Sequence, residues 1–593
     1  MIKKYLLSGI IIVAIVAGVF AVEYHPTKAH DQAADSNNIK LAYNNKTKAI
    51  KGGILQMGLV EDQPFAGIFL PEVTTRDDDV TLAQPLGVSI FKTDKTYKII
   101  DGGAANLRLD AKTKTATITL RKNLKWSDGR SVTAKDLEYP YELVTSPAYQ
   151  AQTYTEALAN IVGMDAYHAG KAKTISGITF TNGQNGRVMQ VAMKAMVPGL
   201  TQAGSGYLLS SVEPYHYLKA IKPNKLTGAP QVRQHPLSWG PYKIAKVMSG
   251  QSITYVRNPY YYGKPAKLAK LQMTSVTTAT SAEALKAKKY DIMYGMPATA
   301  YPAVSKLKDY VQTGHESLAL SSMYFNLGHF DAKQGINIQD RNTPLQNKNL
   351  RAAMGYALNL DEINKKFNYG LQMRANTTVP VAFKQFNDKS IKGFPLNLNK
   401  ANQLLDQAGF KWDAKHEYRL TPAGKAFSLT YLAQNGSENS EVIAQDSIQQ
   451  WKQIGVNVHL YHNRLADFNT WLDMAVSGTN QAWDITDGNA TLSQEPSQAG
   501  MFGKGALYNL GHFTSPELTK LIKNIDSPKA NNLKYRQAQF KAYQAYMTKE
   551  AVVIPKSFSM AWYPVNTRVT GFTTAADSYN NFANIGVSAE AIQ

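Results

Sequence analysis

Few residue patterns in this sequence point to catalysis. The run Ser305-Lys306-Leu307-Lys308 fits S-x-x-K, in which a lysine can activate a serine nucleophile. The Ser-Asp-Asn and Lys-Thr-Gly motifs that accompany such a site are absent from the sequence, so we interpret the match as chance. The H-E-x-x-H pattern of metallopeptidases is also absent. We therefore expect a protein that is not an enzyme.

A metal site is equally unsupported. His459 and His462 are close in sequence, but His459 lies on a strand predicted over 456–461 and His462 directly continues it. Residues i and i+3 of a strand point to opposite faces, so the two rings cannot converge on one ion. The chain has no cysteine, which excludes disulfides, thiolate metal ligands and cysteine nucleophiles. We expect neither a metal nor a cofactor.

The first residues predict export. Met1-Ile2-Lys3-Lys4 is basic, and the run from Tyr5 to Val22 carries no charge. We predict that residues 1–22 are a signal peptide, with a cleavage site after Val19-Phe20-Ala21, or a membrane anchor. Lys3 and Lys4 keep the N-terminus in the cytoplasm and place the rest outside. Residues 23–51 are mostly polar and are predicted to be a flexible tether.

The formal net charge of +21 limits the partners. The basic residues are spread out rather than interleaved with aromatic residues, so nucleic acid is not expected. An anionic membrane surface or wall polymer is the favoured neighbour of an exported chain of this charge. Solubility alone accounts for the charge equally well.

The stretch Leu120–Tyr139 has the strongest local signals. The segment 115–120 alternates polar and apolar residues and predicts a strand, followed by a turn at Ser127-Asp128-Gly129. Thr133 and Asp136 have the spacing of a capping box and predict a helix that starts at Ala134. Pro140 is expected to end or kink that helix early. Trp126 is predicted to pack on it as a structural residue.

Downstream, further elements follow from the same rules. Ser211–Lys225 is predicted to be helical, and Asn347–Leu358 an amphipathic helix, with Asp361 capping the next one. A strand over 427–432, a helix over 440–454 and a strand over 456–461 predict a β-α-β unit with parallel strands. Asp484–Gly503 is predicted to be an irregular loop.

Several short motifs, in order along residues 52–575, resemble the oligopeptide-binding proteins of ABC importers, the extracellular solute-binding proteins of family 5, in their Gram-positive form. The residues that carry the resemblance are Trp126-x-Asp128-Gly129, Thr133-Ala134-x-Asp136, Gly240-Pro241-Tyr242, Asn258-Pro259-Tyr260, Leu350-Arg351-Ala352-Ala353-Met354 with Asp361, Leu404-Leu405 with Ala408-Gly409-Phe410, and Ala551–Pro555. One departure concerns Val19, which follows Val16-Ala17-Gly18 where the family carries a lipidated cysteine.

The resemblance implies an α/β fold of the two-lobed periplasmic-binding-protein type II, with an extra domain and hinge-linked lobes. Lobe I is expected to comprise residues 52–90, 225–305 and 556–593. The extra domain (lobe II) would comprise residues 91–224, and lobe III residues 306–555. The chain would leave lobe I near residue 305 and return near 555, and these two crossing segments would form the hinge.

The resemblance also implies the site. In the family, a carboxylate in a loop near a tryptophan of the second main lobe holds the ammonium of the peptide. The matching stretch here is 482–488, in which Asp487 is the first choice and Asp484, next to Trp483, the second; solvated loop carboxylates remain the alternative. The further ligand-binding candidates are Trp483, Glu495, Phe65, Gly67, Tyr324 and Asn326.

The implied function is capture of peptides, above all oligopeptides, by a monomer on the extracellular face of the cytoplasmic membrane, with delivery to membrane permease subunits. Two alternatives stay open. One is a surface adhesin or structural protein on the same scaffold. The other is a binder of a non-peptide solute such as nickel, haem or a sugar, since the fold does not fix the ligand.

Overall fold

The computed structural model describes residues 39–593, except 75, 88, 148–153 and 477–481. The signal peptide or anchor predicted for residues 1–22, and residues 23–38 of the predicted tether, lie outside the described residues. Within the described ranges, no helix is both long enough and apolar enough to cross a membrane.

Residues 39–51, predicted as the end of a flexible tether, are instead bonded to the folded part of the chain. Ile39 is buried, and Lys40 forms a parallel bridge with Thr313. The short strand β1 (Ala42–Tyr43) pairs with β22 (Phe572–Thr573). The tether prediction was wrong for residues 39–51. Although this segment is mostly polar, it contains apolar side chains such as that of Ile39, whose burial is favourable.

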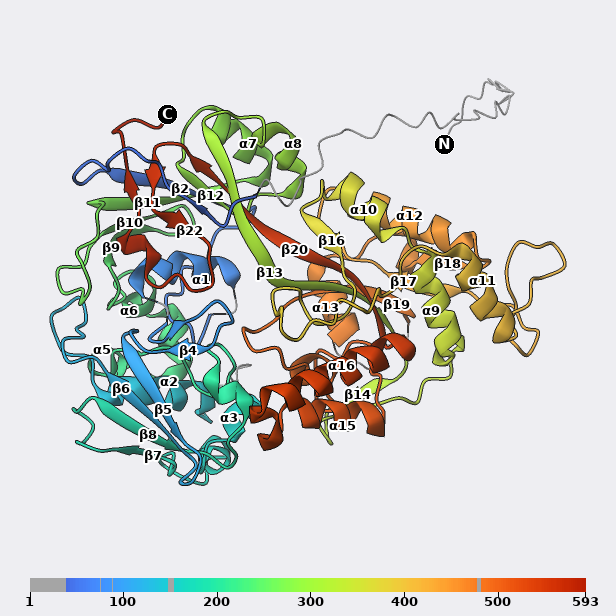
Figure 1. Cartoon of the computed structure of the whole chain (residues 1–593), viewed down its shortest axis with the longest axis horizontal. Coiled ribbons are helices and arrows are strands. Elements are labelled where there is room, and N and C mark those ends of the chain that lie inside the picture. The colour runs from blue at the N-terminus through green and yellow to red at the C-terminus, as the bar shows by residue number, and fades with distance from the viewer. Residues whose placement is uncertain (1–38, 75, 88, 148–153, 477–481) are drawn as a thin grey trace, which may run out of the picture. The chain divides into compact units, whose positions relative to one another are not determined.

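One mixed sheet of eleven strands is the framework of the molecule (Figure 1). Its strands run in the order β18, β17, β19, β13, β20, β12, β2, β11, β10, β9, and β16 is added to β20. Their bounds are Ile54–Val60 (β2), Tyr242–Met248 (β9), Ser252–Arg257 (β10), Lys270–Val276 (β11), Ile292–Tyr294 (β12), Tyr310–Phe325 (β13), Gln372–Arg374 (β16), Leu429–Leu432 (β17), Val458–Leu460 (β18), Ile485–Thr491 (β19) and Val553–Asn566 (β20).

The sheet is parallel where helices connect its strands. β2 pairs in parallel with β11 and with β12, and α7 (Thr278–Lys286) connects β11 to β12. β17 and β18 are parallel and are connected by α12 (Ser440–Lys452). The predicted β-α-β unit is confirmed, because parallel neighbours require such a crossover.

β13 and β20 are the long strands that join the lobe I and lobe III parts of this sheet (Figure 1). They pair antiparallel from Tyr310 opposite Asn566 to Tyr324 opposite Val553, with shifts of register between Glu316 and Leu320 and between Ser321 and Ser322. The two crossings predicted near residues 305 and 555 lie next to the start of β13 and the start of β20.

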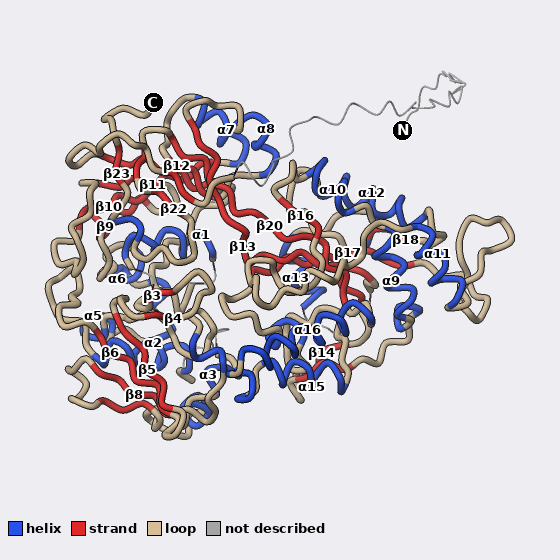
Figure 2. Tube along the Cα trace, viewed as in Figure 1, coloured by secondary structure: helices blue, strands red, loops and turns tan. Residues whose placement is uncertain are grey.

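The extra domain has its own antiparallel sheet, in which β5, β6 and β8 lie side by side (Figure 2). Its strands are Ala105–Asp110 (β5), Thr115–Leu120 (β6), Ile178–Phe180 (β7) and Val188–Ala192 (β8). The predicted strand over 115–120 is confirmed as β6. The predicted helix start is also confirmed, since α2 begins at Ala134 with a capping box of Thr133 and Asp136.

Pro140 does not end this helix, which runs over Ala134–Thr145, so the expectation of an early end was wrong. Proline has no N–H to donate to the carbonyl four residues earlier, that of Asp136. The N–H of Glu213 donates to this carbonyl instead, at 3.1 Å. The freed acceptor is thus satisfied by another segment, and the helix continues.

The remaining helices lie mainly in lobe III. The predicted amphipathic helix is confirmed as α9 (Lys348–Ala357), but Asn359, not Asp361, caps α10 (Leu360–Phe367). The helix predicted over Ser211–Lys225 is reduced to α5 (Tyr215–Leu218) and a 3₁₀ turn that begins at Pro223. The other α-helices are Asp77–Ala83 (α1), Glu156–Ala159 (α3), Met164–His168 (α4), Pro230–Arg233 (α6), Tyr301–Val304 (α8), Leu398–Gln407 (α11), Phe468–Val476 (α13), Ala499–Phe502 (α14), Pro516–Ile525 (α15) and Leu533–Lys549 (α16).

Short strands and 3₁₀ turns complete the described chain. The strands are Lys92–Thr93 (β3), Ile99–Ile100 (β4), His329–Asp331 (β14), Ile336–Ile338 (β15), Val569–Thr570 (β21) and Gly586–Val587 (β23). The 3₁₀ turns are Gln84–Leu86, Pro198–Thr201, Pro223–Gly228, Ala298–Ala300, Pro344–Gln346, Tyr461–Asn463, Pro528–Asn531 and Asn581–Ala583.

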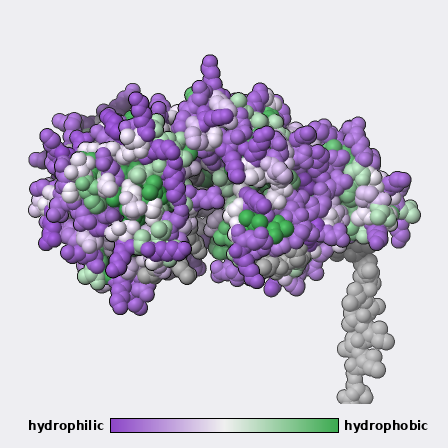
Figure 3. All heavy atoms as spheres, turned by 90° about the horizontal axis from the view of Figure 1, so that it is seen from below, coloured by the Kyte–Doolittle hydropathy of each residue, from purple (hydrophilic) through white to green (hydrophobic). Residues whose placement is uncertain are grey.

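Buried apolar side chains form separate clusters that follow the parts of the chain. One cluster contains residues between 323 and 554, and a second contains residues between 90 and 239. A third combines residues from 55–86, 242–294 and 565–587. The face shown in Figure 3 is mostly hydrophilic, with hydrophobic residues in small groups. The predicted boundaries of lobe I, the extra domain and lobe III serve below as names for these parts.

Candidate functional site

A cavity of about 750 Å³ lies between residues of lobe I and residues of lobe III. This volume falls in the range of small-molecule and cofactor sites in proteins. Lobe I contributes Asp62, Thr278, Ala279 and the segment Pro297-Ala298-Thr299. The wall from lobe III is larger and comes from α10, the loop before α12, and strands β13, β17 and β19. Lys556 and Ser557 of β20, where the chain returns to lobe I, complete the lining.

The lobe I wall is built at the carboxyl ends of two parallel strands. Asp62 follows β2 and Thr278 follows β11, and these strands are neighbours. The N–H of Thr278 donates to Asp62 Oδ1 at 2.8 Å. Asp62 thus accepts a hydrogen bond from one of the N–H groups in the first turn of α7, which have no acceptor within the helix. Ligands of open α/β sheets bind at such strand ends, which agrees with the place of the cavity.

The lobe III wall combines an apolar helix face with a polar loop. Leu360, Ile363 and Phe367 of α10 line the cavity at helical spacing. The loop from Asn435 to Ser440 lines it at the start of α12. The wall therefore offers apolar surface beside hydroxyl, amide and main-chain groups, a combination typical of ligand pockets.

Asp487 is the carboxylate of this wall with the closest charged partner. Its Oδ2 lies 2.6 Å from Lys556 Nζ and also accepts a hydrogen bond from the Tyr431 hydroxyl. Burial, reinforced by the charge of Asp487, raises the pKa of Tyr431 well above its usual value, so the phenol stays protonated and donates. Asp487 Oδ1 is buried and has no hydrogen-bond partner in the described structure.

Asp487 lies on a strand and not in a loop. The irregular loop predicted for Asp484–Gly503 was wrong over Ile485–Thr491, which forms β19. β19 pairs with β13 from Phe325 opposite Ile485 to Ala319 opposite Thr491. Asp, Gly and Asn are depleted in strands, so these residues suggest a loop, and the pairing with β13 overrides that tendency.

Asp484 and Trp483 bind other parts of lobe III and do not line the cavity. Asp484 Oδ1 lies 2.9 Å from Arg341 Nη2, and its Oδ2 accepts the N–H of Thr430 at 2.8 Å. Trp483 is 1% exposed and donates from Nε1 to the carbonyl of Met474 at 3.1 Å. Both residues fix the start of β19.

Glu495 lies in a separate buried group of charges. It forms an ion pair with Arg536 and accepts the N–H of Ser497 at 2.6 Å. Asp526 adjoins this group, and burial together with the charge of Glu495 raises the pKa of Asp526 to about 7. Glu495 does not line the cavity.

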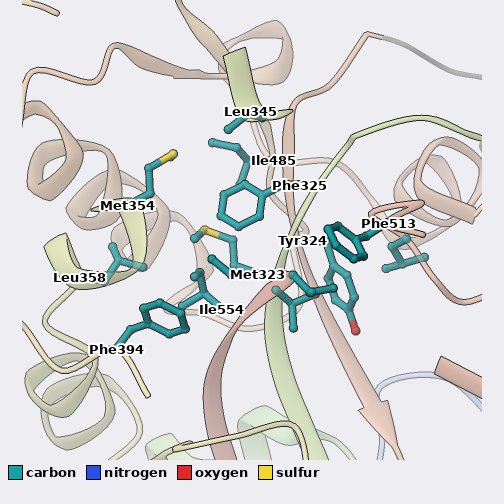
Figure 4. Packing of buried hydrophobic residues seen from close by; sticks show 14 of the residues in the cluster. Met323, Tyr324, Phe325, Leu345, Met354, Leu358, Phe394, Ile485, Phe513 and Ile554 are labelled. Carbon is teal, nitrogen blue, oxygen red and sulfur yellow. The ribbon is translucent and has the colours of Figure 1, made fainter. Parts of the chain in front are cut away.

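The remaining four candidates also lie away from the cavity lining. Phe65 is buried in the lobe I core, and Gly67, with a φ of +68°, donates its N–H to Asp79 Oδ1 at 2.7 Å. Tyr324 lies among the core side chains of lobe III, near Phe513 (Figure 4). Asn326 donates from Nδ2 to the carbonyl of Trp483 at 3.1 Å. Of the eight predicted residues, the structure brings only Asp487 into the lining.

Sequence reasoning missed the partners of Asp487. Lys556 directly follows the Ala551–Pro555 motif, and a charge next to this apolar run was a usable signal. Tyr431 lay in the strand predicted over 427–432, and no sequence motif around it indicated a function. Asp62 lies three residues before Phe65, and Phe65 and Gly67 were chosen as candidates instead.

The two histidines considered for metal binding are arranged differently from the prediction. The strand ends at Leu460, so only His459 lies on it, while His462 follows in a 3₁₀ turn with a φ of +50°. The expected strand over 456–461 was therefore too long. Among the residues that the structure describes, no group of three or more His, Cys, Asp or Glu side chains could hold a metal ion.

Comparison with known proteins gives a consistent result. A model of the bacterial extracellular solute-binding proteins, family 5 Middle, matches residues 99–503. The oligopeptide-binding protein OppA of Lactococcus lactis subsp. cremoris (strain SK11) is 47% identical over 558 residues, 93% of each chain. OppA of Bacillus subtilis (strain 168) is 28% identical over 378 residues, 63% of this chain and 64% of its own.

Comparison with solved structures points to the same family as the sequence comparisons. Lactococcal OppA, complexed with an endogenous peptide in the closed conformation, superposes with a TM-score of 0.82 at 47% identity, over 90% of this chain and 100% of that chain. AppA from Bacillus subtilis, in complex with a nonapeptide, gives a TM-score of 0.68 at 19% identity, over 91% and 100%, and supports the fold alone. The resemblance read from the motifs is confirmed: the chain belongs to the bacterial extracellular solute-binding proteins of family 5, with their two-lobed α/β fold.

Proposed function

We propose that this protein captures oligopeptides in the cavity between lobe I and lobe III and delivers them to an ABC importer. It acts as a monomer outside the cytoplasmic membrane and hands its ligand to membrane permease subunits. The relatives named as oligopeptide-binding, and the lactococcal structure that holds a peptide, support this proposal.

The observation that carries the proposal is the makeup of the cavity. Its walls come from both lobes, so a ligand held there contacts both and favours their closure. Apolar surface on α10 suits peptide side chains, and the polar loop at 435–440 suits the peptide main chain. Each main-chain hydrogen bond contributes only about 0.5–1.5 kcal/mol, so several are needed. An extended peptide supplies them without a fixed sequence.

Asp487 is the proposed contact for the amino end of the peptide. It is the one predicted site residue that lines the cavity, and its side chain is 23% exposed. Asp484 and Glu495 are engaged by Arg341 and Arg536 and serve the structure of lobe III. β13 and β20 are the proposed hinge, because they alone among the described strands of the large sheet join its two parts directly.

Calorimetric titration of ligand-free protein with oligopeptides tests the proposal. The expected result is heat of binding, together with a smaller radius of gyration in solution scattering as the lobes close. Asp487→Ala should weaken binding by roughly tenfold or more, the loss typical of a hydrogen bond to a charged group. Asp340→Ala, which alters an exposed carboxylate, is the matched control. No heat with any peptide would favour an adhesin or structural protein.

A further inference from the structure

The starts of four strands in lobe I carry a concentration of lysines on one side of the molecule. We propose that this basic edge binds the surface of an anionic lipid membrane and holds the protein there with its cavity open to solution. The basic edge consists of residues 48–51, 264–270, 286–289 and 306–308, which lie at or just before the starts of β2, β11, β12 and β13. This surface lies away from the cavity, so the proposal goes beyond the proposed function.

The directions of the strands bring these four segments together. β2 pairs in parallel with both β11 and β12. β20 is antiparallel to β12 and to β13, so β13 runs in the same direction as β12. All four strands therefore start at the same edge of the sheet. The main-chain N–H of Ala269 donates to the carbonyl of Gly53 at 3.1 Å and joins two of the segments directly.

The basic edge contains ten lysines and no acidic residue. Nine of these lysines are exposed, and Lys270 is half-buried. Lys286 lies 2.6 Å from Glu283, and Lys288 lies 2.9 Å from Asp309. Both of these ion pairs are exposed, and such pairs are weak in water. The edge therefore keeps a large excess of positive charge, although its lysines are spread out in the sequence.

The residues next to the basic edge leave this charge in place. Asp291 is buried and is paired with Arg568, so it does not attract the lysines. Glu590 is an exposed acidic residue close to the edge, because Arg568 donates to the carbonyls of both Ile54 and Glu590. The side chain of Ile54 is 41% exposed, and Ile54 is the β-pairing partner of Lys270. An apolar side chain among lysines suits the interface of an anionic membrane.

The cavity lies at the other ends of the same strands. Asp62, Thr278 and the segment Pro297-Ala298-Thr299 line it, after β2, β11 and β12. β2 alone has seven residues and is roughly 23 Å long. A membrane at the basic edge therefore leaves the cavity open to peptides in solution. The contact is also reversible, because salt screens the attraction between exposed charges.

The described chain begins on the side of the basic edge. The N–H of Lys40 donates to the carbonyl of Gln312 at 3.0 Å, and the carbonyl of Lys40 accepts the N–H of Gly314 at 2.9 Å. The bridge is parallel, so Ile39 is nearer the start of β13 than Lys40 is. Residues 1–22 are the predicted signal peptide or anchor, and residues 23–38 can span at most about 55 Å. An anchored chain would keep the edge near lipid, which favours a membrane over a wall polymer as the partner.

Sedimentation with lipid vesicles tests the proposal. The protein used is the chain from residue 23 onward, because residues 33–593 form a compact unit and the predicted anchor is then absent. Vesicles of phosphatidylglycerol and phosphatidylcholine in equal parts should bind it, and vesicles of phosphatidylcholine alone should not. Binding should be roughly tenfold or more weaker in 1 M than in 0.1 M sodium chloride, because the Debye length falls from about 10 Å to about 3 Å.

Two variants with the same change of total charge locate the contact. The first reverses one charge in each segment of the basic edge: Lys51→Glu, Lys267→Glu, Lys289→Glu and Lys308→Glu. It should bind anionic vesicles at least about tenfold more weakly, since each lysine near an anionic surface contributes about fivefold. The control reverses four exposed lysines on α15 and α16 of lobe III: Lys520→Glu, Lys523→Glu, Lys534→Glu and Lys541→Glu. The control should keep most of the binding, and both variants should keep their affinity for peptides.

Three results would overturn the proposal and leave the proposed function standing: no binding to anionic vesicles, equal binding to neutral vesicles, or an equal loss in the two variants. Retention on poly(glycerol phosphate) without binding to vesicles would assign the edge to a wall polymer and overturn it too. Hydrogen exchange of the wild-type protein decides the matter if the edge variant does not fold. Anionic vesicles should slow exchange in residues 264–270 and 286–289 but not in α15 and α16, and protection confined to other segments would contradict the proposal.

Discussion

Arg568 and Asp291 form a bidentate ion pair in the interior of lobe I, with Nε 2.6 Å from Oδ1 and Nη2 2.7 Å from Oδ2. Their side chains are 2% and 0% exposed. Arg568 also donates to the carbonyl of Ile54, and Asp291 Oδ2 accepts the N–H of Gln56. The pair thus fastens the chain segment after β20 to the first strand of lobe I.

Arg568→Met should destabilise the protein by about 3–5 kcal/mol, because it leaves the Asp291 carboxylate buried without a cation. Chemical unfolding followed by tryptophan fluorescence measures the change. The double variant Arg568→Met with Asp291→Leu should lose less than Arg568→Met alone. A loss below about 1 kcal/mol in the single variant would show that the pair does not hold the segments together.

Trp126→Ala should lower stability by about 3–5 kcal/mol and leave peptide affinity per folded molecule unchanged. Trp126 is 1% exposed and donates from Nε1 to Asp136 Oδ2, which also caps α2, and it does not line the cavity. Thermal unfolding and titration of the same preparation measure the two effects. Trp126→Phe, which keeps most of the ring, should lie between. A large loss of affinity in well-folded protein would contradict this division of roles.

Glu213→Gln should stabilise the protein at pH 8 and not at pH 4. Burial, with the charges of Glu72 and Asp136, raises the pKa of Glu213 well above the ordinary value near 4.5. The folded chain therefore keeps a proton that the unfolded chain releases, and this contribution to stability is lost as the pH rises above about 4.5. Each pKa unit of difference corresponds to about 1.4 kcal/mol. The glutamine is neutral at both pH values and avoids the loss.

Melting temperatures of the variant and the wild type at pH 4, 6 and 8 measure this difference. Glu156→Gln, at an exposed position in α3, is the control and should show no pH-dependent gain. An equal effect of Glu213→Gln at pH 4 and pH 8 would mean that the ionisation of Glu213 does not limit stability.

Tyr97→Ala should speed the release of a bound peptide by roughly two- to tenfold. The ring of Tyr97 in the extra domain meets the ring of Phe383 in lobe III edge to face, with centroids 5.9 Å apart. Such pairs contribute about 0.5–1.5 kcal/mol beyond their buried area, and this contact is lost if the lobes open. Stopped-flow fluorescence with a labelled peptide measures the rate. Tyr260→Ala, at a half-exposed tyrosine of lobe I, is the control, and equal rates in both variants would refute the role of the contact.

Local patterns were sufficient to predict much of the fold. The Thr133/Asp136 box specifies the start of α2, and the spacing of Leu350, Ala353 and Met354 specifies α9, because these signals act within a few residues. The strand β19 was missed because its Asp487-Gly488-Asn489 segment suits a loop, and only its partner β13 makes it a strand.

The site could be predicted only in part, for a related reason. Asp487, which lines the cavity, could be named as a first choice because the family resemblance places a carboxylate near a tryptophan. Its partners Lys556 and Tyr431 are 69 and 56 residues away in the chain, and the order of strands β17, β19, β13 and β20 brings them together. No local pattern specifies that order, so the ion pair between Asp487 and Lys556 became visible only in the structure.

Native mass spectrometry of the protein purified without added ligand tests the central claim most directly. If the cavity holds oligopeptides, the spectrum should show several bound masses that collapse to the bare chain on denaturation, and the released material should sequence as peptides of varied composition. A single bound mass that belongs to one small non-peptide solute would contradict the account. A bare chain that also gives no heat with a peptide library would contradict it as well.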